Sequence, residues 1–135
     1  MKILFICRAN VGRSQMAEAI FNNQNSQHTA SSAGLNPPPQ WEGEKLSKTK
    51  YVAPCLLEIG IDVSEKISKR LSEEMVNESD HVIVIGEKNA WPEYLNERNV
   101  RYWGVIDPDI GEMDLHREVR DEITSLIKQL LSELK

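Results

Sequence analysis

The segments 3–6 and 81–85 of the chain are apolar at nearly every position. Such runs are typical of strands in a parallel sheet whose two faces are both covered by helices. Segments 28–33 and 100–105 are less regular, and they predict two further strands. The first strand is expected to end at Cys7.

The spacing of apolar residues becomes helical from Arg13 onward. The apolar residues that follow fall on one side of a helix: Met16, Ala17, Ala19, Ile20 and Phe21. Glu18 and Asn22 are then left on the side that faces solvent. Residues 8–12 therefore form a loop between a strand and a helix, the place where open α/β sheets bind ligands.

Later segments predict further helices. Residues 45–58 have helical spacing, with Pro54 as the weak point and Gly60 as the terminator. Ser72, followed by two acidic residues, is a good N-cap for a short helix, and residues 89–96 read as another. The final helix has apolar residues about one turn apart: Val119, Ile123, Ile127, Leu130 and Leu134.

Strands that alternate with helices predict an α/β fold of three layers, a small open parallel sheet of about four strands with helices on both faces. A length of 135 residues is that of one ordinary domain, covering residues 1–135. The proline-rich segment 36–43 suits neither helix nor strand, and we expect it to border the ligand site.

The loop after the first strand has the composition of an anion-binding nest. Its backbone N–H groups and the unpaired N–H groups of the following helix converge on one point, which suits a tetrahedral oxyanion. Gly12 and Asn10 are the residue types that best tolerate a sharply curved backbone. We expect residues 8–14 to bind the anion: Arg8, Ala9, Asn10, Val11, Gly12, Arg13 and Ser14.

Three side chains give this loop its predicted chemistry. Arg13 offers a planar fork of donors that grips two oxygens of a phosphate. The helix dipole and the surrounding donors favour the thiolate form of Cys7, which is then a nucleophile towards phosphorus. Ser14 is placed to donate its hydroxyl to that sulfur and to stabilise it again when it leaves.

The motif Cys-x5-Arg-Ser at Cys7, with Asn10 inside it, resembles the low-molecular-weight protein tyrosine phosphatase superfamily, which includes arsenate reductases. Other segments match in the same order: Gln15-Met16-Ala17-Glu18, Ser32-Ala33-Gly34-Leu35, Ile59-Gly60-Ile61-Asp62 and Asp107-Pro108. The resemblance spans nearly the whole chain. It implies a phosphatase that acts through a phosphocysteine intermediate.

The resemblance also implies a general acid. Asp107 follows the last predicted strand and should lie at the carboxyl edge of the sheet, where it protonates the leaving oxygen and later activates water. Asp109 is the fallback for that role. The catalytic residues expected are therefore Cys7, Arg13 and Asp107.

The chain departs from the family pattern at four positions. Gly12 replaces a second cysteine that many members have, Ala9 replaces the usual glycine, and Arg8 adds positive charge. Asp109 and Ile110 stand where members acting on phosphotyrosine often have aromatic residues. Trp41 is an alternative aromatic wall, with structural packing as its other role.

Composition narrows the possible partners. The formal net charge of −5 argues against nonspecific nucleic-acid binding, and no apolar run approaches the length of a membrane span. The two cysteines, Cys7 and Cys55, are expected to be reduced thiols in a cytoplasmic protein. We expect no metal, no cofactor, no membrane partner, and a monomer or weak dimer.

Three functions stay open at this point. The first is a cysteine-dependent phosphatase acting on a phosphorylated protein or a small phosphomonoester. The second is an arsenate reductase that uses a small thiol, because residues 86–89 lack the cysteines of thioredoxin-coupled members. The third, a phosphocarrier with phosphate on Cys7, is disfavoured because it has no use for Asp107 and typically lacks the arginine.

Overall fold

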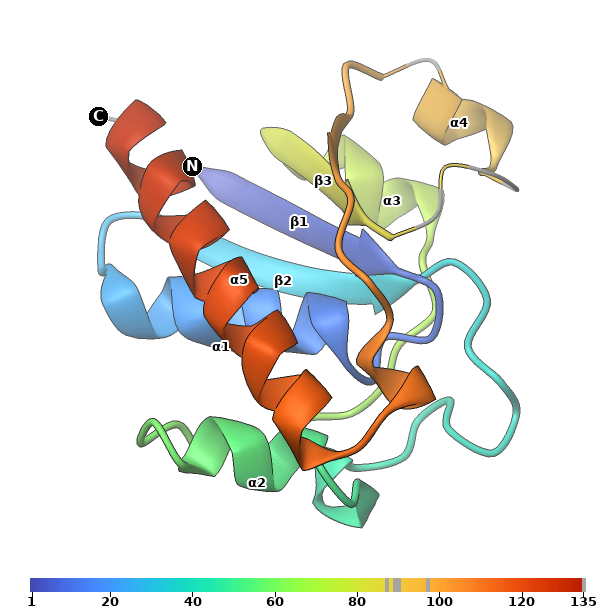
Figure 1. The fold of residues 1–135 in the computed structure, drawn as a ribbon. Coiled ribbons are helices and arrows are strands. Elements are labelled where there is room, and N and C mark those ends of the chain that lie inside the picture. The colour runs from blue at the N-terminus through green and yellow to red at the C-terminus, as the bar shows by residue number, and fades with distance from the viewer. Residues whose placement is uncertain (87, 89–90, 97, 135) are drawn as a thin grey trace.

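The structure is a computed structural model, and it describes residues 1–86, 88, 91–96 and 98–134. An open sheet of four parallel strands lies between two layers of helices (Figure 1). This arrangement confirms the predicted α/β class and the helices on both faces. The strands are β1 (Lys2–Cys7), β2 (Thr29–Gly34), β3 (His81–Ile85) and β4 (Arg101–Trp103).

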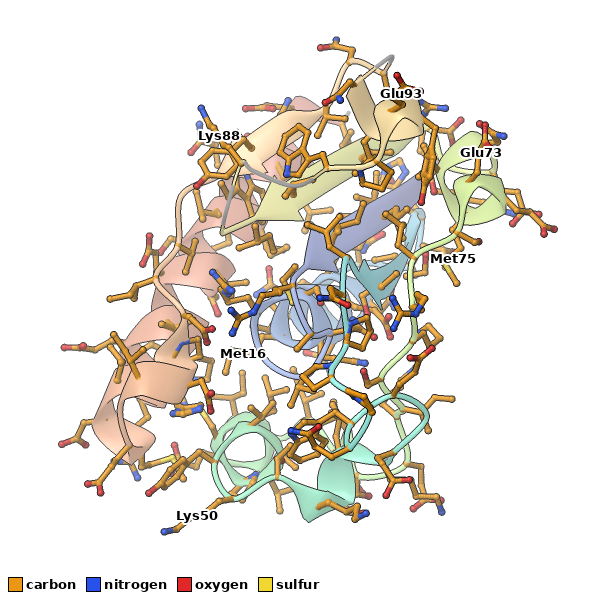
Figure 2. The ribbon with its side chains drawn as sticks, turned by 90° about the vertical axis from the view of Figure 1, so that its right-hand side faces the viewer. Met16, Lys50, Glu73, Met75, Lys88 and Glu93 are labelled. Carbon is orange, nitrogen blue, oxygen red and sulfur yellow. The ribbon has the colours of Figure 1, made fainter. Side chains whose placement is uncertain are left out.

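The helices divide between the two faces according to the alternation of side chains along β1. Ile3 and Phe5 pack with α1, α2 and α5, whereas Leu4 and Ile6 pack with α3 and α4. The helices are α1 (Arg13–Gln24), α2 (Val52–Leu57), α3 (Glu73–Asn77), α4 (Glu93–Asn96) and α5 (Met113–Glu133), with short 3-10 turns η1 (Leu46–Lys48) and η2 (Pro108–Ile110). Figure 2 shows Met16 at the centre of the molecule, with Glu73 and Glu93 at the surface.

The strand order β2-β1-β3-β4 makes the end of β1 the natural ligand site. The chain leaves β1 through α1 to reach β2 on one side, and later returns to β3 on the other side. Connections therefore diverge at the carboxyl end of β1, which opens a crevice there. Cys7, the last residue of β1, pairs with Gly34 at the end of β2.

The helix expected over residues 45–58 is interrupted. Only η1 and α2 are helical, because Thr49 is extended between them with φ −76° and ψ 142°. Its hydroxyl accepts a hydrogen bond from the Ala53 N–H at 2.9 Å. Pro54 is the third residue of α2, where a missing N–H costs nothing because first-turn N–H groups have no helical partner.

Glu18 does not face solvent as the helical spacing indicated. It is 4% exposed, whereas Asn22 is exposed as expected. All of residues 13–21 are buried, because α1 is covered by the sheet, by α5 and by the segment after α2. When other segments surround a helix on several sides, its polar residues do not show which face meets solvent.

Other boundaries differ by a few residues. Strand β2 begins and ends one residue later than expected, and β4 keeps only the middle of segment 100–105. Of the helix expected over residues 89–96, α4 forms the end, and residues 89 and 90 lie outside the described part. Ser72 caps α3 as expected, accepting from the Met75 N–H at 3.3 Å. None of the described helices has the length and apolar character needed to cross a bilayer.

A cluster of ion pairs joins the end of α2 to α5. Glu58 accepts hydrogen bonds from Arg117 at 2.7 Å and from Arg120 at 2.8 Å. Arg120 is 9% exposed and also donates to the Cys55 carbonyl at 2.9 Å. The hydrogen bonds from Arg117 and Arg120 lower the pKa of Glu58 from 4.5 to about 2.

We predict that the Glu58 cluster stabilises the fold above its ordinary pKa. Because the folded-state pKa is depressed, this stability is fully present above pH 4.5 and is lost as the pH falls towards 2. Glu58→Gln should therefore be less stable than wild type near neutral pH, and the difference should shrink below pH 4.5. Urea unfolding midpoints measured across this pH range check the prediction.

Asp114→Asn is the matched control for the Glu58 variant. Asp114 pairs with the same Arg117 at 3.1 Å, but its side chain is 99% exposed, so its loss should leave the midpoint unchanged. Equal effects of the two variants, or a Glu58→Gln effect that does not depend on pH, would contradict the assignment.

Candidate active site

The loop between β1 and α1 is sharply curved and held from outside. Asn10 is left-handed with φ 58°, whereas Gly12, also expected to allow the curvature, has φ −112°. The Cys7 and Arg8 carbonyls accept from the N–H groups of Leu35 and Asn36, both at 2.8 Å. The chain after β2 therefore fixes where the loop begins.

Two further residues determine where the outer side of this loop lies. Ser68 donates its hydroxyl to the Ala9 carbonyl at 2.8 Å. Gly34 allows the loop to lie directly against β2, because a Cβ there would come within 2.9 Å of the Arg8 oxygen and the Ala9 carbonyl carbon. A side chain at position 34 would push the loop away from the sheet.

The Cys7 sulfur lies at the base of the loop and is in contact with Ser14. The Sγ to Oγ distance is 2.9 Å, and both residues are buried. The Asn10 amide donates to Ser14 at 2.8 Å and to Ser32 at 2.9 Å. Thus Asn10 both shapes the backbone and holds the serine that touches the sulfur.

Arg13 is 4% exposed, and its guanidinium lies against the segments that follow β3 and β4. Its Nη1 donates to the Val105 carbonyl at 3.0 Å. Gly86, after β3, has φ 114°, and a Cβ there would lie 2.2 Å from the same Nη1. The guanidinium therefore passes over a backbone position that only glycine leaves open.

Asp107 faces both arginines of the loop. Its Oδ2 lies 3.6 Å from Arg13 Nη2 and 3.7 Å from Arg8 Nη2. Its Oδ1 accepts from the Asp109 N–H at 3.0 Å, which caps η2 and fixes the carboxylate. The structure thus brings together Cys7, Arg13 and Asp107 from three separate segments.

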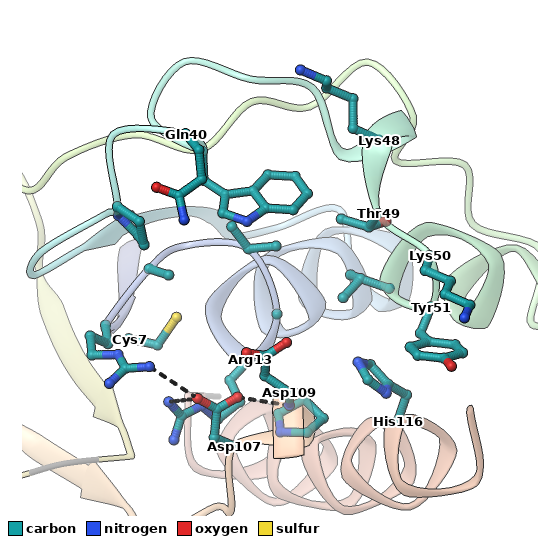
Figure 3. A pocket seen from close by; sticks show the side chains of 18 residues that line it. Cys7, Arg13, Gln40, Lys48, Thr49, Lys50, Tyr51, Asp107, Asp109 and His116 are labelled. Carbon is teal, nitrogen blue, oxygen red and sulfur yellow. Dashed lines mark hydrogen bonds and ion pairs between the residues drawn. The ribbon is translucent and has the colours of Figure 1, made fainter. Parts of the chain in front are cut away.

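These side chains line one cleft of about 400 Å³. Figure 3 shows Cys7, Arg13 and Asp107 at one end, and Tyr51 and His116 at the other. Of the expected loop residues, Asn10 and Ser14 do not line the cleft and instead support it from below. The lining residues are Cys7, Arg8, Ala9, Val11, Gly12, Arg13, Pro38, Gln40, Trp41, Lys48, Thr49, Lys50, Tyr51, Val52, Asp107, Pro108, Asp109 and His116.

The far end of the cleft was not predicted from the sequence. His116 is buried, its Nδ1 lies 2.8 Å from the Glu112 carbonyl, and its ring packs on Tyr51 with centroids 4.9 Å apart. Residues 48–50 form the adjoining wall. The proline-rich segment contributes Pro38, Gln40 and Trp41, which confirms that it borders the site.

The cleft offers no metal centre within the described residues. No group of three or more His, Cys, Asp or Glu side chains there is arranged to hold a metal ion. The other thiol, Cys55, is fully buried beside Arg120 and is not a lining residue. Burial raises the pKa of the Cys55 thiol, whereas Cys7 is the cysteine that lines the cleft.

A thiol beneath an oxyanion loop, facing a guanidinium and a carboxylate, is the arrangement of a cysteine-dependent phosphatase. Comparison with known proteins agrees. The chain belongs to the family described as low molecular weight phosphotyrosine protein phosphatase, whose family model matches residues 2–135. Proteins of this family are enzymes, as the sequence predicted.

Relatives in this family carry several activities in their names. The protein-arginine-phosphatase of Bacillus subtilis is 28% identical, over 100% of this chain and 97% of its own length. The glutaredoxin arsenate reductase of a Synechocystis species is 28% identical over 98% of each chain. The crystal structure of a low molecular weight protein tyrosine phosphatase from T. tengcongensis has a TM-score of 0.82 and 28% identity, covering 98% of this chain and 99% of that one.

We predict that Gly86→Ala disables the site while leaving the chain folded. The new Cβ meets the Arg13 guanidinium at 2.2 Å and also strains a backbone with φ 114°. A guanidinium displaced by about 1 Å should lower kcat/KM about 100-fold. Hydrolysis of p-nitrophenyl phosphate, followed beside a thermal unfolding curve, measures both effects.

Gly104→Ala is the matched control for Gly86. A Cβ at position 104 would lie 3.5 Å from the Tyr102 ring, an ordinary contact, and no positive φ is involved. This variant should keep near wild-type activity. Full activity in Gly86→Ala would mean that the placement of Arg13 does not matter for turnover.

Proposed function

We propose that this protein hydrolyses phosphomonoesters through a phosphocysteine formed on Cys7. One observation carries the proposal: Cys7, Arg13 and Asp107 line the same cleft although they come from β1, α1 and the segment after β4. The Asp107 carboxylate is 3.6 Å from the Arg13 guanidinium. A phosphate held by that guanidinium would therefore lie between the sulfur and an acid.

The two arginines of the cleft suggest how phosphate binds. Arg8 and Arg13 both face Asp107, at 3.7 and 3.6 Å. When a phosphate dianion binds above Cys7, the two guanidinium groups would bind it instead of the Asp107 carboxylate. The backbone N–H groups of the loop would donate to the same phosphate. Arg13 is buried and held at Val105, so it would supply a fixed pair of donors, whereas the more exposed Arg8 would follow the substrate.

The first chemical step would transfer the phosphoryl group to sulfur. The Cys7 thiolate attacks phosphorus and forms an S–P bond, while the bond from phosphorus to the leaving oxygen breaks. Protonated Asp107 gives its proton to that oxygen, so an alcohol or phenol departs instead of an anion. The hydroxyl of Ser14 stabilises the thiolate before the attack, at an Sγ to Oγ distance of 2.9 Å.

The second step would release phosphate. Asp107, now a carboxylate, takes a proton from water as the water oxygen attacks phosphorus. The S–P bond breaks, its electron pair returns to the Cys7 sulfur, and inorganic phosphate leaves. The Cys7 thiolate is then restored, and Asp107 again carries a proton like the one it gave up in the first step.

The cleft walls favour a phosphorylated protein or a small phosphomonoester as substrate. Trp41 and Tyr51 supply aromatic surface, and Ile110 is 73% exposed directly after the lining residue Asp109. The names of the family and of a relative point to two alternatives: phosphotyrosine, which is a phosphomonoester, and phosphoarginine, whose leaving atom would be nitrogen instead of oxygen. Peptides carrying each phosphorylated residue, compared by kcat/KM, determine which one this cleft prefers.

We predict that Cys7→Ser abolishes hydrolysis of p-nitrophenyl phosphate, because an alcohol lacks the ionised nucleophile. Asp107→Asn should lower kcat about 100-fold or more, since an amide cannot donate the proton. The loss should be larger for aryl phosphates with poor leaving groups. Steady-state kinetics with a series of substituted aryl phosphates measures this dependence.

Asp109→Asn decides between the two carboxylates of this segment. Only the backbone N–H of Asp109 bonds to Asp107, so its side chain is expected to be dispensable for proton transfer. If the loss of activity grows with poorer leaving groups in Asp109→Asn and not in Asp107→Asn, then Asp109 is the general acid and Asp107 is not. Wild-type activity in Cys7→Ser would remove the proposed mechanism altogether.

Arsenate reduction is the second candidate, and the placement of the thiols restricts its route. The chain has two cysteines, and Cys55 is fully buried between α2 and α5. An internal cysteine relay would require that helix pair to open, so a reductase here would need an external small thiol. Arsenate reduction measured with and without glutathione tests this route, and activity without any added thiol would contradict it.

A further inference from the structure

A buried chain of hydrogen bonds connects the Cys7 sulfur to a carboxylate on α1. Its links are Cys7 to Ser14 at 2.9 Å, Asn10 to Ser14 at 2.8 Å, Asn10 to Ser32 at 2.9 Å, and Ser32 to Glu18 at 2.8 Å. Each of these five side chains belongs to a buried residue. The mechanism above uses only the end of the chain that touches sulfur.

The orientation of the Asn10 amide is fixed by its neighbours. Its oxygen accepts from the Lys69 backbone N–H at 2.9 Å and from Gln15 at 3.1 Å. A backbone N–H can only donate, so the amide oxygen must face Lys69 and the NH₂ group must face the two serines. The two hydrogens of that NH₂ group are then used on Ser14 and Ser32.

This orientation decides the direction of the remaining links. Each serine oxygen accepts from Asn10 and keeps one hydrogen of its own. Ser32 gives its hydrogen to Glu18, because an ionised carboxylate can only accept. Ser14 then donates its hydrogen to the Cys7 sulfur. The chain therefore places a hydrogen-bond donor against the sulfur that carries negative charge as a thiolate.

Glu18 is itself held by cations. Its second oxygen lies 3.3 Å from Lys66 Nζ, while the Glu18 side chain is 6% exposed and that of Lys66 is 53% exposed. Lys69 is a further cation that interacts with this carboxylate, and burial lowers the pKa of Lys69. These two lysines compensate the Glu18 charge, so that it does not oppose the thiolate electrostatically.

We propose that Glu18 and its partner Lys66 are positioning residues for the Cys7 thiolate, acting through Ser32, Asn10 and Ser14. The inference rests on the proposed role of Cys7 as nucleophile. An ionised acceptor at the end of the chain takes the Ser32 hydroxyl hydrogen, so Ser32 offers only lone pairs to Asn10 and holds the Asn10 NH₂ group in the orientation that also reaches Ser14. The carboxylate therefore sets the reactivity of a sulfur that it does not touch.

The test measures the reactivity of Cys7 directly. Glu18→Gln keeps the shape and removes the charge, and it should lower both kcat/KM for p-nitrophenyl phosphate and the rate of Cys7 alkylation about tenfold. KM should change little, because Glu18 does not line the cleft. Alkylation by iodoacetamide at mildly acidic pH is followed by mass spectrometry of the Cys7 peptide.

Three further variants separate this role from a merely structural one. Lys66→Met should slow alkylation in the same direction, and Lys66→Arg should restore it. Ser32→Ala breaks the chain between its ends, so adding Glu18→Gln to Ser32→Ala should cause no further loss. Glu65→Gln removes the exposed Lys45–Glu65 pair and should leave every rate unchanged.

The outcomes distinguish this inference from the proposed function. Turnover that is equal in wild type and Cys7→Ser would overturn the phosphatase mechanism, whatever Glu18 does. Turnover that depends on Cys7, with wild-type alkylation rates in folded Glu18→Gln and Lys66→Met, would overturn the role of Glu18 alone. Losses from Glu18→Gln and Ser32→Ala that simply add would also overturn it, because the chain would then not connect them.

Discussion

The structure depends on one constraint: a backbone loop must curve around an anion while a thiol sits beneath it. A chain of L-residues resists this curvature, and the strain falls on Asn10 at φ 58°. The conformation persists because the surroundings determine it from several sides. Neighbouring segments supply hydrogen bonds to the carbonyls of Cys7, Arg8 and Ala9, and Gly34 allows the close approach.

What the sequence predicted well was local. The first strand, the loop and the start of α1 are contiguous, so consecutive apolar residues and the positions of Cys7 and Arg13 define them without knowledge of the rest. The position of Asp107 at this edge was expected for a similar reason, since it comes soon after the last strand segment of a parallel sheet, whose carboxyl ends share one edge; its role as general acid, which the family resemblance implied, stays a prediction. These expectations depend on chain order and strand polarity, and both are visible in a sequence.

What the sequence did not predict depends on residues distant along the chain. Glu18 was expected in solvent, but Ser32 and Lys66 reach it from 14 and 48 positions away in the sequence and enclose it. The far end of the cleft pairs Tyr51 with His116, 65 positions apart. Gly86 reads as an ordinary loop glycine until the Arg13 guanidinium is placed over it. No periodicity encodes such contacts, because each follows from how helices and loops pack on the sheet.

The two cysteines show how differently the same side chain can be surrounded in one fold. Cys55 lies among the apolar side chains between α2 and α5, where burial raises the pKa of its thiol. Arg120 is close to that sulfur, at 3.7 Å, but its guanidinium also serves Glu58 and the Cys55 carbonyl. Cys7 is equally hidden from bulk solvent, yet it lines a cleft and has a hydroxyl donor against its sulfur. Burial alone therefore does not distinguish the two thiols; what differs is that the Cys7 sulfur lines the cleft and has a hydroxyl against it.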